Sequence, residues 1–383
     1  MSGLLFFVFF SLIPVAKKSA PLDSINVQEA LEMVALCNTF SLDGLFKNTN
    51  ALLPFGYRKI AESKETPLHN AVKIFKKDKT LVVVFRGTVS ETNSWLENVH
   101  YMQIPAQNEL QIEDQKYPYN FSIASHAAVH SGYVLATAYL WEDLKKMFSE
   151  SMLRGITKII LTGHSQGGAL AQLFLAQMSL KTNFQQFELS NYSFGSPSIG
   201  NQSFSDDYNR RFKNKSFRFV NTSDFVCKLP LNNQTLELKF KGYKAQLDLE
   251  MIRDLAQLGL EILPEKYRTR VDKISEVSDK IASQSVKHLV GHVVFPSLKK
   301  ASFFAETGKT IYLEPMPNPN KANKSIRRNQ KSYQKGLDLL MFGIKQKLDT
   351  YQHNNFTYYN ALHKHYESPA FYRLRLRKLP DNK

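Results

Sequence analysis

The stretch Gly163-His164-Ser165-Gln166-Gly167-Gly168 decides the fold of this 383-residue chain. The apolar residues 159–161 lead into it and the helix-forming residues 169–173 follow it, so the order strand, sharp turn, helix is predicted. Glycines two residues before and two residues after Ser165 allow the strand and the helix to pass closely at such a turn. The pattern is typical of a nucleophile elbow with Ser165 at its tip. A glycine-rich turn that merely caps a helix is the alternative.

A serine nucleophile needs two hydrogen-bond donors aimed at the oxyanion that forms during attack. The backbone N–H of Gln166, one residue after the serine, is the first predicted donor. The apolar run 81–85 predicts a buried strand that ends just before Thr88, and Thr88 is the second predicted donor, through its backbone N–H and its hydroxyl. The alternative is that Thr88 only ends a strand. Arg86 is predicted to form a structural ion pair.

Two further strands are predicted downstream, at 189–194 and 216–221. Asp224 follows the second of them closely. A serine followed by a carboxylate just past a later strand is the chain order of an α/β-hydrolase triad, so Asp224 is the predicted orienting carboxylate. An Asx turn after a strand is the alternative for this aspartate.

Five segments between about residues 70 and 230 resemble the class 3 lipase family of α/β-hydrolases, in family order and with family-like spacing. These segments are 84–88 with 93–98, 129–133, 162–171, 194–201 and 220–230. The resemblance implies an α/β fold with a mostly parallel central sheet, flanking helices and an inserted helical segment. It also implies Ser165 as nucleophile, Asp224 as triad acid, and Thr88 with Gln166 as oxyanion hole. Cys227 stands where the family usually has proline.

The third member of the triad has several candidates, because five histidines follow Asp224 in the chain. Only an imidazole with a pKa near neutrality can accept the serine proton and return it to the leaving alcohol. The segment 353–362 resembles the family's ending, in which a histidine is followed five residues later by tyrosine, so His353 is the predicted base. His292 is interpreted as a strand histidine that lines the site. The alternatives to His353 are His292, His363 and His365.

The rest of the chain is consistent with one lipase-like domain over residues 23–383. Apolar residues at helical spacing predict an inserted helical segment at about 243–290, either a cap over the site or a surface ornament. The segment 93–104 matches the position of the family's lid, and an ordinary loop helix is the alternative. A further amphipathic helix is predicted over 337–348.

The N-terminal residues 1–22 contain an apolar run that is too short to span a bilayer and is typical of a signal peptide. Export, as a secreted or periplasmic protein, is therefore predicted, and retention at a membrane through this segment is the alternative. Cys37 and Cys227 are far apart in the sequence, and whether they pair is left open. No Cys/His cluster with metal spacing and no nucleotide-binding loop occurs, so no cofactor and no metal are predicted.

Positive charge is concentrated towards the C-terminus of the chain. Residues 299–383 contain 17 Lys or Arg against 6 Asp or Glu, within a net charge of +16 for the whole chain. Such clusters suit an anionic lipid surface, and no nucleic-acid motif accompanies them. A solvated basic face is the alternative. The basic clusters comprise Lys321, Lys324, Arg327, Arg328, Lys331 and Lys335, and then Arg373, Arg375, Arg377 and Lys378.

Taken together, the residues predict a carboxylic-ester hydrolase that acts on lipid esters, as a triacylglycerol lipase or a phospholipase A1, through an acyl-enzyme. A catalytically silent lipase-like protein that binds a lipid or a partner is the alternative.

Overall fold

The computed structural model describes residues 25–41, 53–89, 98, 102–224, 226–229, 292–296, 304–317 and 350–366. The N-terminal segment 1–22, the insertion at 243–290, the helix at 337–348 and the basic clusters lie outside the described residues. Among the residues that are described, no helix is both long enough and apolar enough to cross a bilayer.

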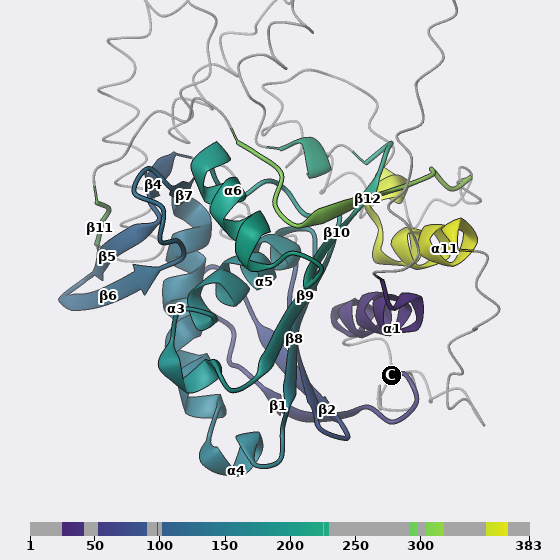
Figure 1. The fold of residues 1–383 in the computed structure, drawn as a ribbon, viewed down its shortest axis with the longest axis horizontal. Coiled ribbons are helices and arrows are strands. Elements are labelled where there is room, and N and C mark those ends of the chain that lie inside the picture. Colours follow the sequence, from purple (N-terminus) through teal and green to yellow (C-terminus); the bar gives the residue numbers. More distant parts are fainter. Residues whose placement is uncertain are drawn as a thin grey trace, which may run out of the picture.

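A seven-stranded sheet forms the centre of the molecule, in the order β1-β2-β3-β8-β9-β10-β12 (Figure 1). Neighbours from β3 to β12 pair in parallel, whereas β1, β2 and β3 pair antiparallel. The mostly parallel sheet expected from the sequence is therefore confirmed. The strands are β1 (Arg58–Glu62), β2 (Val72–Lys77), β3 (Thr80–Phe85), β8 (Lys158–His164), β9 (Glu188–Phe194), β10 (Ser216–Asn221) and β12 (Lys309–Leu313).

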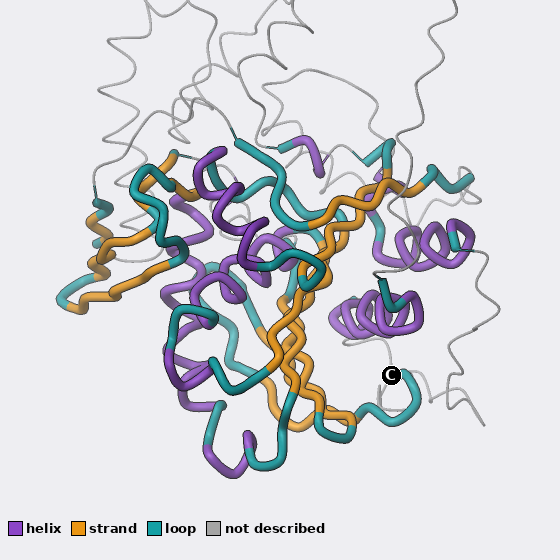
Figure 2. The backbone as a smooth tube through the Cα atoms, viewed as in Figure 1, coloured by secondary structure: helices purple, strands orange, loops and turns teal. Residues whose placement is uncertain are grey.

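Helices cover both faces of this sheet (Figure 2). A parallel strand at the centre is buried on both sides, which is why β3 and the first half of β8 appear as apolar runs in the sequence. Neighbouring side chains of one strand point to opposite faces, so Val83 packs in the core beneath α3 and α5 while Val82 packs in the core beneath α1 and α11. The helices are α1 (Val27–Cys37), α3 (Ser131–Met147), α4 (Glu150–Leu153), α5 (Gln166–Met178), α6 (Gln202–Arg211) and α11 (Asn355–His365).

Two small sheets flank the central one. In the first, β4 (Gln103–Pro105) pairs with β7 (Ala128–His130), and in the second, β11 (Val293–Val294) pairs with the hairpin of β5 (Gln107–Ile112) and β6 (Gln115–Asn120). The predicted lid segment 93–104 therefore ends inside a strand, while most of its other residues lie outside the described ranges. Short 3₁₀ turns complete the described chain: η2 (Asn38–Phe40), η4 (Thr182–Phe184), η5 (Val226–Lys228) and η6 (Thr350–His353).

The two cysteines do not pair with each other. Both are buried and free, and each has its own partner. Cys37 Sγ lies 3.6 Å from Thr162 Oγ1, and Cys227 Sγ lies 3.5 Å from Asp224 Oδ2. The question that the sequence left open is answered by these separate surroundings.

Candidate active site

Ser165 occupies a strained backbone position between β8 and α5. Its φ is 59° and its ψ is −135°, a conformation that residues with a side chain rarely adopt. A Cβ on Gly163 would lie 2.2 Å from the backbone of Gly167, and a Cβ on Gly167 would lie 2.2 Å from the carbonyl oxygen of Phe85. Only glycine fits at either position, so the close crossing of β3, β8 and α5 follows directly from the sequence motif.

Three side chains from distant parts of the chain form one hydrogen-bonded line. His353 Nε2 lies 2.9 Å from Ser165 Oγ, and His353 Nδ1 lies 2.7 Å from Asp224 Oδ2. All three side chains are buried: the exposed fraction is 6% for Ser165, 6% for His353 and 1% for Asp224. An imidazole between a hydroxyl and a carboxylate can take the hydroxyl proton on one nitrogen while the carboxylate stabilises the resulting imidazolium.

The other histidines considered as bases lie in different places. His292 is exposed, and its backbone N–H donates to Glu113 Oε1 at the turn between β5 and β6, away from the line of three side chains. The strand that follows His292, β11, joins this hairpin rather than the central sheet. His363 and His365 lie in the last turn of α11.

Asp224 accepts hydrogen bonds from several groups besides the imidazole. The Val226 N–H donates to its Oδ1 at 2.9 Å, and the Tyr358 hydroxyl donates to its Oδ2 at 2.7 Å. Burial and the charge of Asp224 hold the pKa of both Tyr358 and Cys227 well above their usual ranges, so each remains a protonated donor. Sequence reasoning noted a tyrosine five residues after His353 but assigned it no contact, and the structure places its hydroxyl on the carboxylate.

His164 packs against the candidate base. Its ring centroid lies 4.6 Å from that of His353 and 5.7 Å from that of Tyr358. Burial, together with repulsion from a charged His353, lowers the pKa of His164 well below its usual value. His164 is thus an uncharged neighbour of the His353 ring rather than a competing base.

The loop after β3 lies directly against the elbow. A Cβ on Gly87 would lie 2.8 Å from the carbonyl oxygen of His164 and 3.4 Å from Ser165 Cβ. The following residue, Thr88, donates from Oγ1 to Gln166 Oε1 at 3.0 Å. The two residues predicted as oxyanion donors are therefore adjacent in space. The Thr88 hydroxyl proton is engaged by the Gln166 side chain.

A chain of hydrogen bonds supports Thr88 from the opposite side. Asn98 Nδ2 donates to Thr88 Oγ1 at 3.1 Å, and the Tyr133 hydroxyl donates to Asn98 Oδ1 at 3.0 Å. Tyr133 in turn stacks on the buried ring of His130, with centroids 4.0 Å apart. Sequence reasoning treated Asn98 only as part of the lid-like segment, because a long-range side-chain contact leaves no periodic signal.

Other predicted side chains have structural roles in the described residues. Arg86 forms an ion pair with Glu65 at 2.7 Å, as predicted. Arg218, which sequence reasoning missed, is 1% exposed and donates from Nη2 to the carbonyl oxygens of Ser196 and Cys227, both at 2.8 Å. It thereby ties together the loops that follow β9 and β10. Nowhere in the described ranges do three or more His, Cys, Asp or Glu side chains gather as metal ligands.

Curated proteins similar to this chain include several lipases. "Lipase A" of Sodiomyces alcalophilus is 28% identical over 192 residues, which cover 46% of this chain and 44% of that protein. "Triacylglycerol lipase OBL1" of Nicotiana tabacum is 38% identical over 90 residues, or 22% of this chain and 16% of that protein. "Secreted mono- and diacylglycerol lipase 1" of Fusarium solani is 28% identical over 153 residues, or 40% of each chain. The chain spans less than half the length of these relatives.

Solved structures similar to this chain include the triacylglyceride lipase of Rhizomucor miehei. That comparison has a TM-score of 0.41 and 19% sequence identity, and it covers 56% of this chain and 77% of that one. Residues 82–234 match the family described as "Lipase (class 3)", and this range contains Thr88, Ser165, Gln166 and Asp224. The resemblance to the class 3 lipase family is therefore confirmed over residues 82–234 of this chain.

Proposed function

We propose that this protein hydrolyses carboxylic esters of lipids with Ser165 as nucleophile, His353 as general base and Asp224 as the orienting carboxylate. The observation that carries the proposal is the line of hydrogen bonds from Ser165 Oγ through the His353 ring to Asp224 Oδ2, at 2.9 and 2.7 Å. The family match and the names of the similar proteins support the same chemistry.

In the first half of the reaction, Ser165 Oγ attacks the ester carbonyl carbon while His353 Nε2 takes the hydroxyl proton. The carbonyl electron pair moves to oxygen and gives a tetrahedral oxyanion. When the oxyanion collapses, the bond to the leaving alkoxide breaks, and the same imidazole gives its proton to that oxygen. A water molecule then repeats both steps on the acyl-serine, releasing a carboxylic acid and regenerating Ser165.

Two backbone N–H groups, those of Gln166 and Thr88, form the oxyanion hole in this proposal. Gln166 is the first residue of α5, and the positive end of the helix dipole lies there, which suits a developing negative charge. Removing one oxyanion donor typically lowers kcat by about 10² to 10³. Asn98 would keep Thr88 in place through its hydrogen bond to the hydroxyl.

For the substrate, we propose acylglycerols, because relatives from three genera are named as acylglycerol lipases. Hydrolysis of phospholipids at the sn-1 position is the other outcome of the same assay. We further propose that residues 1–22 direct export, in keeping with relatives named as secreted lipases. Docking on anionic lipid through the basic clusters is a separate proposal with its own test below.

The test uses the purified full chain and a panel of acylglycerols, phospholipids and a soluble short-chain ester. Ser165→Ala and His353→Ala are each expected to lower ester hydrolysis by about four orders of magnitude or more, because residues of a triad act as a unit. His365→Ala on α11 is the matched control and should retain wild-type turnover. A covalent serine-hydrolase probe should label Ser165.

Undiminished turnover by Ser165→Ala would overturn the proposal. Lipid binding by the wild type without turnover and without labelling of Ser165 would favour the silent lipase-like binding protein instead. Hydrolysis of phospholipids alone would replace acylglycerols as the substrate class while leaving the serine mechanism intact.

A further inference from the structure

Asn221, the last residue of β10, lies where two turns with candidate catalytic residues meet. One turn follows β10 directly and leads to Asp224. The other turn is η6, which carries His353 and precedes α11. His353 and Asp224 are 129 positions apart in the sequence, and their atoms Nδ1 and Oδ2 lie 2.7 Å apart. Asn221 is fully buried between these turns, so its contacts bear directly on that distance.

The side chain of Asn221 shapes the turn that leads to Asp224. Its Oδ1 accepts a hydrogen bond from the Ser223 N–H at 3.1 Å, and its backbone carbonyl accepts one from the Asp224 N–H at 2.9 Å. An asparagine oxygen that accepts from the N–H two residues later forms an Asx turn, which fixes the local direction of the backbone. Asn221 therefore sets the position of Asp224 relative to the end of β10.

The same side-chain amide holds the turn that carries His353. Asn221 Nδ2 has two hydrogens, and Gln352 accepts both of them, at its backbone carbonyl over 3.2 Å and at its Oε1 over 2.9 Å. Gln352 directly precedes His353, so these bonds fix the backbone one residue from the imidazole. Beyond His353, the Tyr358 hydroxyl accepts a hydrogen bond from the Asn221 N–H at 3.1 Å.

The loop after β12 fixes the orientation of the Gln352 amide. The Met316 N–H donates to Gln352 Oε1 at 3.1 Å, and Gln352 Nε2 donates to the Met316 carbonyl at 2.7 Å. A backbone N–H can only donate and a backbone carbonyl can only accept, so the oxygen of Gln352 must face the Met316 N–H. That oxygen also faces Asn221, which is consistent with Nδ2 as the donor there and with Oδ1 as the acceptor from Ser223.

From these contacts we propose that Asn221 is a positioning residue, which keeps the turns of Asp224 and His353 at a fixed separation. This role rests on the function proposed above, because it belongs to the same reaction. Without the amide, Gln352 loses its bonds to the end of β10, and η6 can shift relative to Asp224. If a misplacement of 1 Å costs about 10²-fold in rate, a shift of about half that distance costs about tenfold.

The kinetic test removes the amide from either side in the full-length protein. Asn221→Leu has a side chain of similar volume and should lower kcat on a soluble ester about tenfold. KM should change little, because the fully buried Asn221 cannot touch the substrate. Gln352→Leu breaks the same contact and should lower kcat to a similar extent. The double variant should be about as active as the less active single variant, since residues in contact act non-additively.

Asn191→Leu is the matched control for loss of a buried amide. Asn191, on β9, is fully buried, and its amide bonds the Leu161 carbonyl and the Ser216 hydroxyl. Ser216 is the first residue of β10, about 17 Å along the strand from Asn221 at 3.3 Å per residue. The control should lose stability in chemical denaturation as Asn221→Leu does, and it should keep the wild-type kcat.

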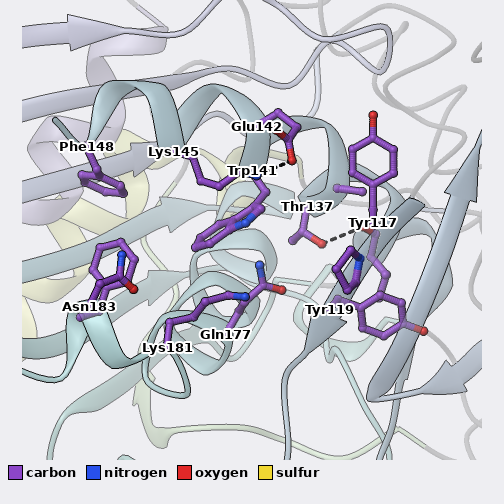
Figure 3. A pocket seen from close by; sticks show the side chains of 14 residues that line it. Tyr117, Tyr119, Thr137, Trp141, Glu142, Lys145, Phe148, Gln177, Lys181 and Asn183 are labelled. Atoms are coloured by element: carbon purple, nitrogen blue, oxygen red, sulfur yellow. Dashed lines mark hydrogen bonds and ion pairs between the residues drawn. The ribbon is translucent and has the colours of Figure 1, made fainter. Parts of the chain in front are cut away.

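Thr137→Val is a second control, with a smaller change of structure. It removes a buried hydrogen bond from the Thr137 hydroxyl to the Val134 carbonyl on α3. Thr137 lines a cavity of about 260 Å³ whose wall includes the last turn of α5, at the far end of that helix from Ser165 (Figure 3). This variant should therefore also keep the wild-type kcat.

The His353→Ala background separates positioning from a general loss of structure. Variants without a triad residue retain residual catalysis from the oxyanion hole and substrate binding, which an activated aryl ester makes measurable. Because the imidazole is absent in this background, Asn221→Leu should cause no further loss of activity. A variant that damages the site generally would lower the rate in both backgrounds.

Proton NMR reports the same geometry without turnover. A proton held between an imidazole nitrogen and a buried carboxylate is strongly deshielded, and His353→Ala should remove its resonance and thereby assign it. Asn221→Leu and Gln352→Leu should weaken this resonance and speed its exchange with water. Asn191→Leu should leave it unchanged.

Three results would overturn the positioning role. They are an unchanged resonance in Asn221→Leu, equal loss of kcat in Asn221→Leu and Asn191→Leu, and a further loss from Asn221→Leu in the His353→Ala background. A wild type without the deshielded proton would also overturn it, because the separation of 2.7 Å would then not exist in solution. If the wild type hydrolyses no ester, the proposed function fails, yet loss of the resonance in Asn221→Leu but not in Asn191→Leu still supports the positioning role.

Discussion

Gly195 offers a sharp test of how closely the three candidate catalytic side chains are packed. It follows β9 with a φ of +61°, and a Cβ added to it would lie 3.0 Å from Asp224 Oδ2 and 3.2 Å from His353 Cε1. Ordinary contacts of a Cβ begin near 3.4 Å, so Gly195→Ala should displace the carboxylate or the imidazole by about 0.4 Å. If a misplacement of 1 Å costs about 10²-fold in rate, a displacement of 0.4 Å costs about sixfold.

The expected result is therefore a kcat about sixfold below wild type on a soluble ester, with KM nearly unchanged. The unfolding free energy should also fall by about 1 to 2 kcal/mol, because alanine is disfavoured at positive φ. Gly155→Ala separates these two effects. Gly155 has a φ of +75°, but nothing lies within 4 Å of a Cβ added there, so the variant should lose similar stability and keep its activity.

Steady-state kinetics and chemical denaturation of both variants supply the measurements. Equal activity of Gly195→Ala and Gly155→Ala would refute the reasoning, since the backbone strain is common to both and the contact with the site is not. A Gly195→Ala variant that unfolds like the wild type would likewise contradict the cost assigned to its positive φ.

Three further expectations concern other parts of the molecule. Asn98→Ala should lower kcat about tenfold and leave KM nearly unchanged, because Asn98 acts on the oxyanion only through its hydrogen bond to Thr88. This loss is smaller than the loss expected when an oxyanion donor is removed directly. An unchanged kcat would show that Asn98 does not position Thr88. His164 has a lowered pKa in the folded state, so the unfolded chain binds more protons below pH 6.5, and the wild type should lose stability there by at most about 1.4 kcal/mol per pH unit. Between pH 6.5 and 5, His164→Asn should abolish that loss of stability, as measured by chemical denaturation at each pH. The control His126→Asn, at an exposed histidine, should show the same loss as the wild type. If stability falls with pH equally in all three proteins, the loss does not come from His164. If the basic clusters dock on anionic vesicles, each charge near the surface contributes on the order of 1 kcal/mol, and hydrolysis there should fall as salt shortens the Debye length from about 10 Å at 0.1 M to 3 Å at 1 M. Hydrolysis of a soluble ester should not change with salt. If the rates on vesicles and on the soluble ester depend on salt in the same way, the basic clusters form a solvated face and do not dock on lipid. The variant for this test neutralises Lys324, Arg327, Arg328 and Lys331.

Local chemistry in the sequence was sufficient for the tip of the elbow, and the family resemblance carried by such motifs was sufficient for the fold class. The glycines on either side of Ser165 predict a backbone crossing that leaves no room for a Cβ. In the structure, a Cβ added to Gly163 or Gly167 would lie only 2.2 Å from a neighbouring backbone atom. The apolar run at 81–85 predicts a buried strand, because burial on both faces removes the usual alternation. These features are readable because each depends on residues within one turn or one strand.

The tertiary structure alone decided which histidine adjoins Ser165, and it brought in the side chains that support the site. His353 lies 188 residues from Ser165 in the chain; the sequence favoured it through its resemblance to the family's ending but left His292, His363 and His365 as alternatives. The contacts of Tyr358 with Asp224 and of Asn98 with Thr88 likewise join separate elements. Local patterns in the sequence specify backbone conformation and burial. Which side chains meet depends instead on where each connection between strands brings the chain back to the sheet, and the packing of the whole core sets that position.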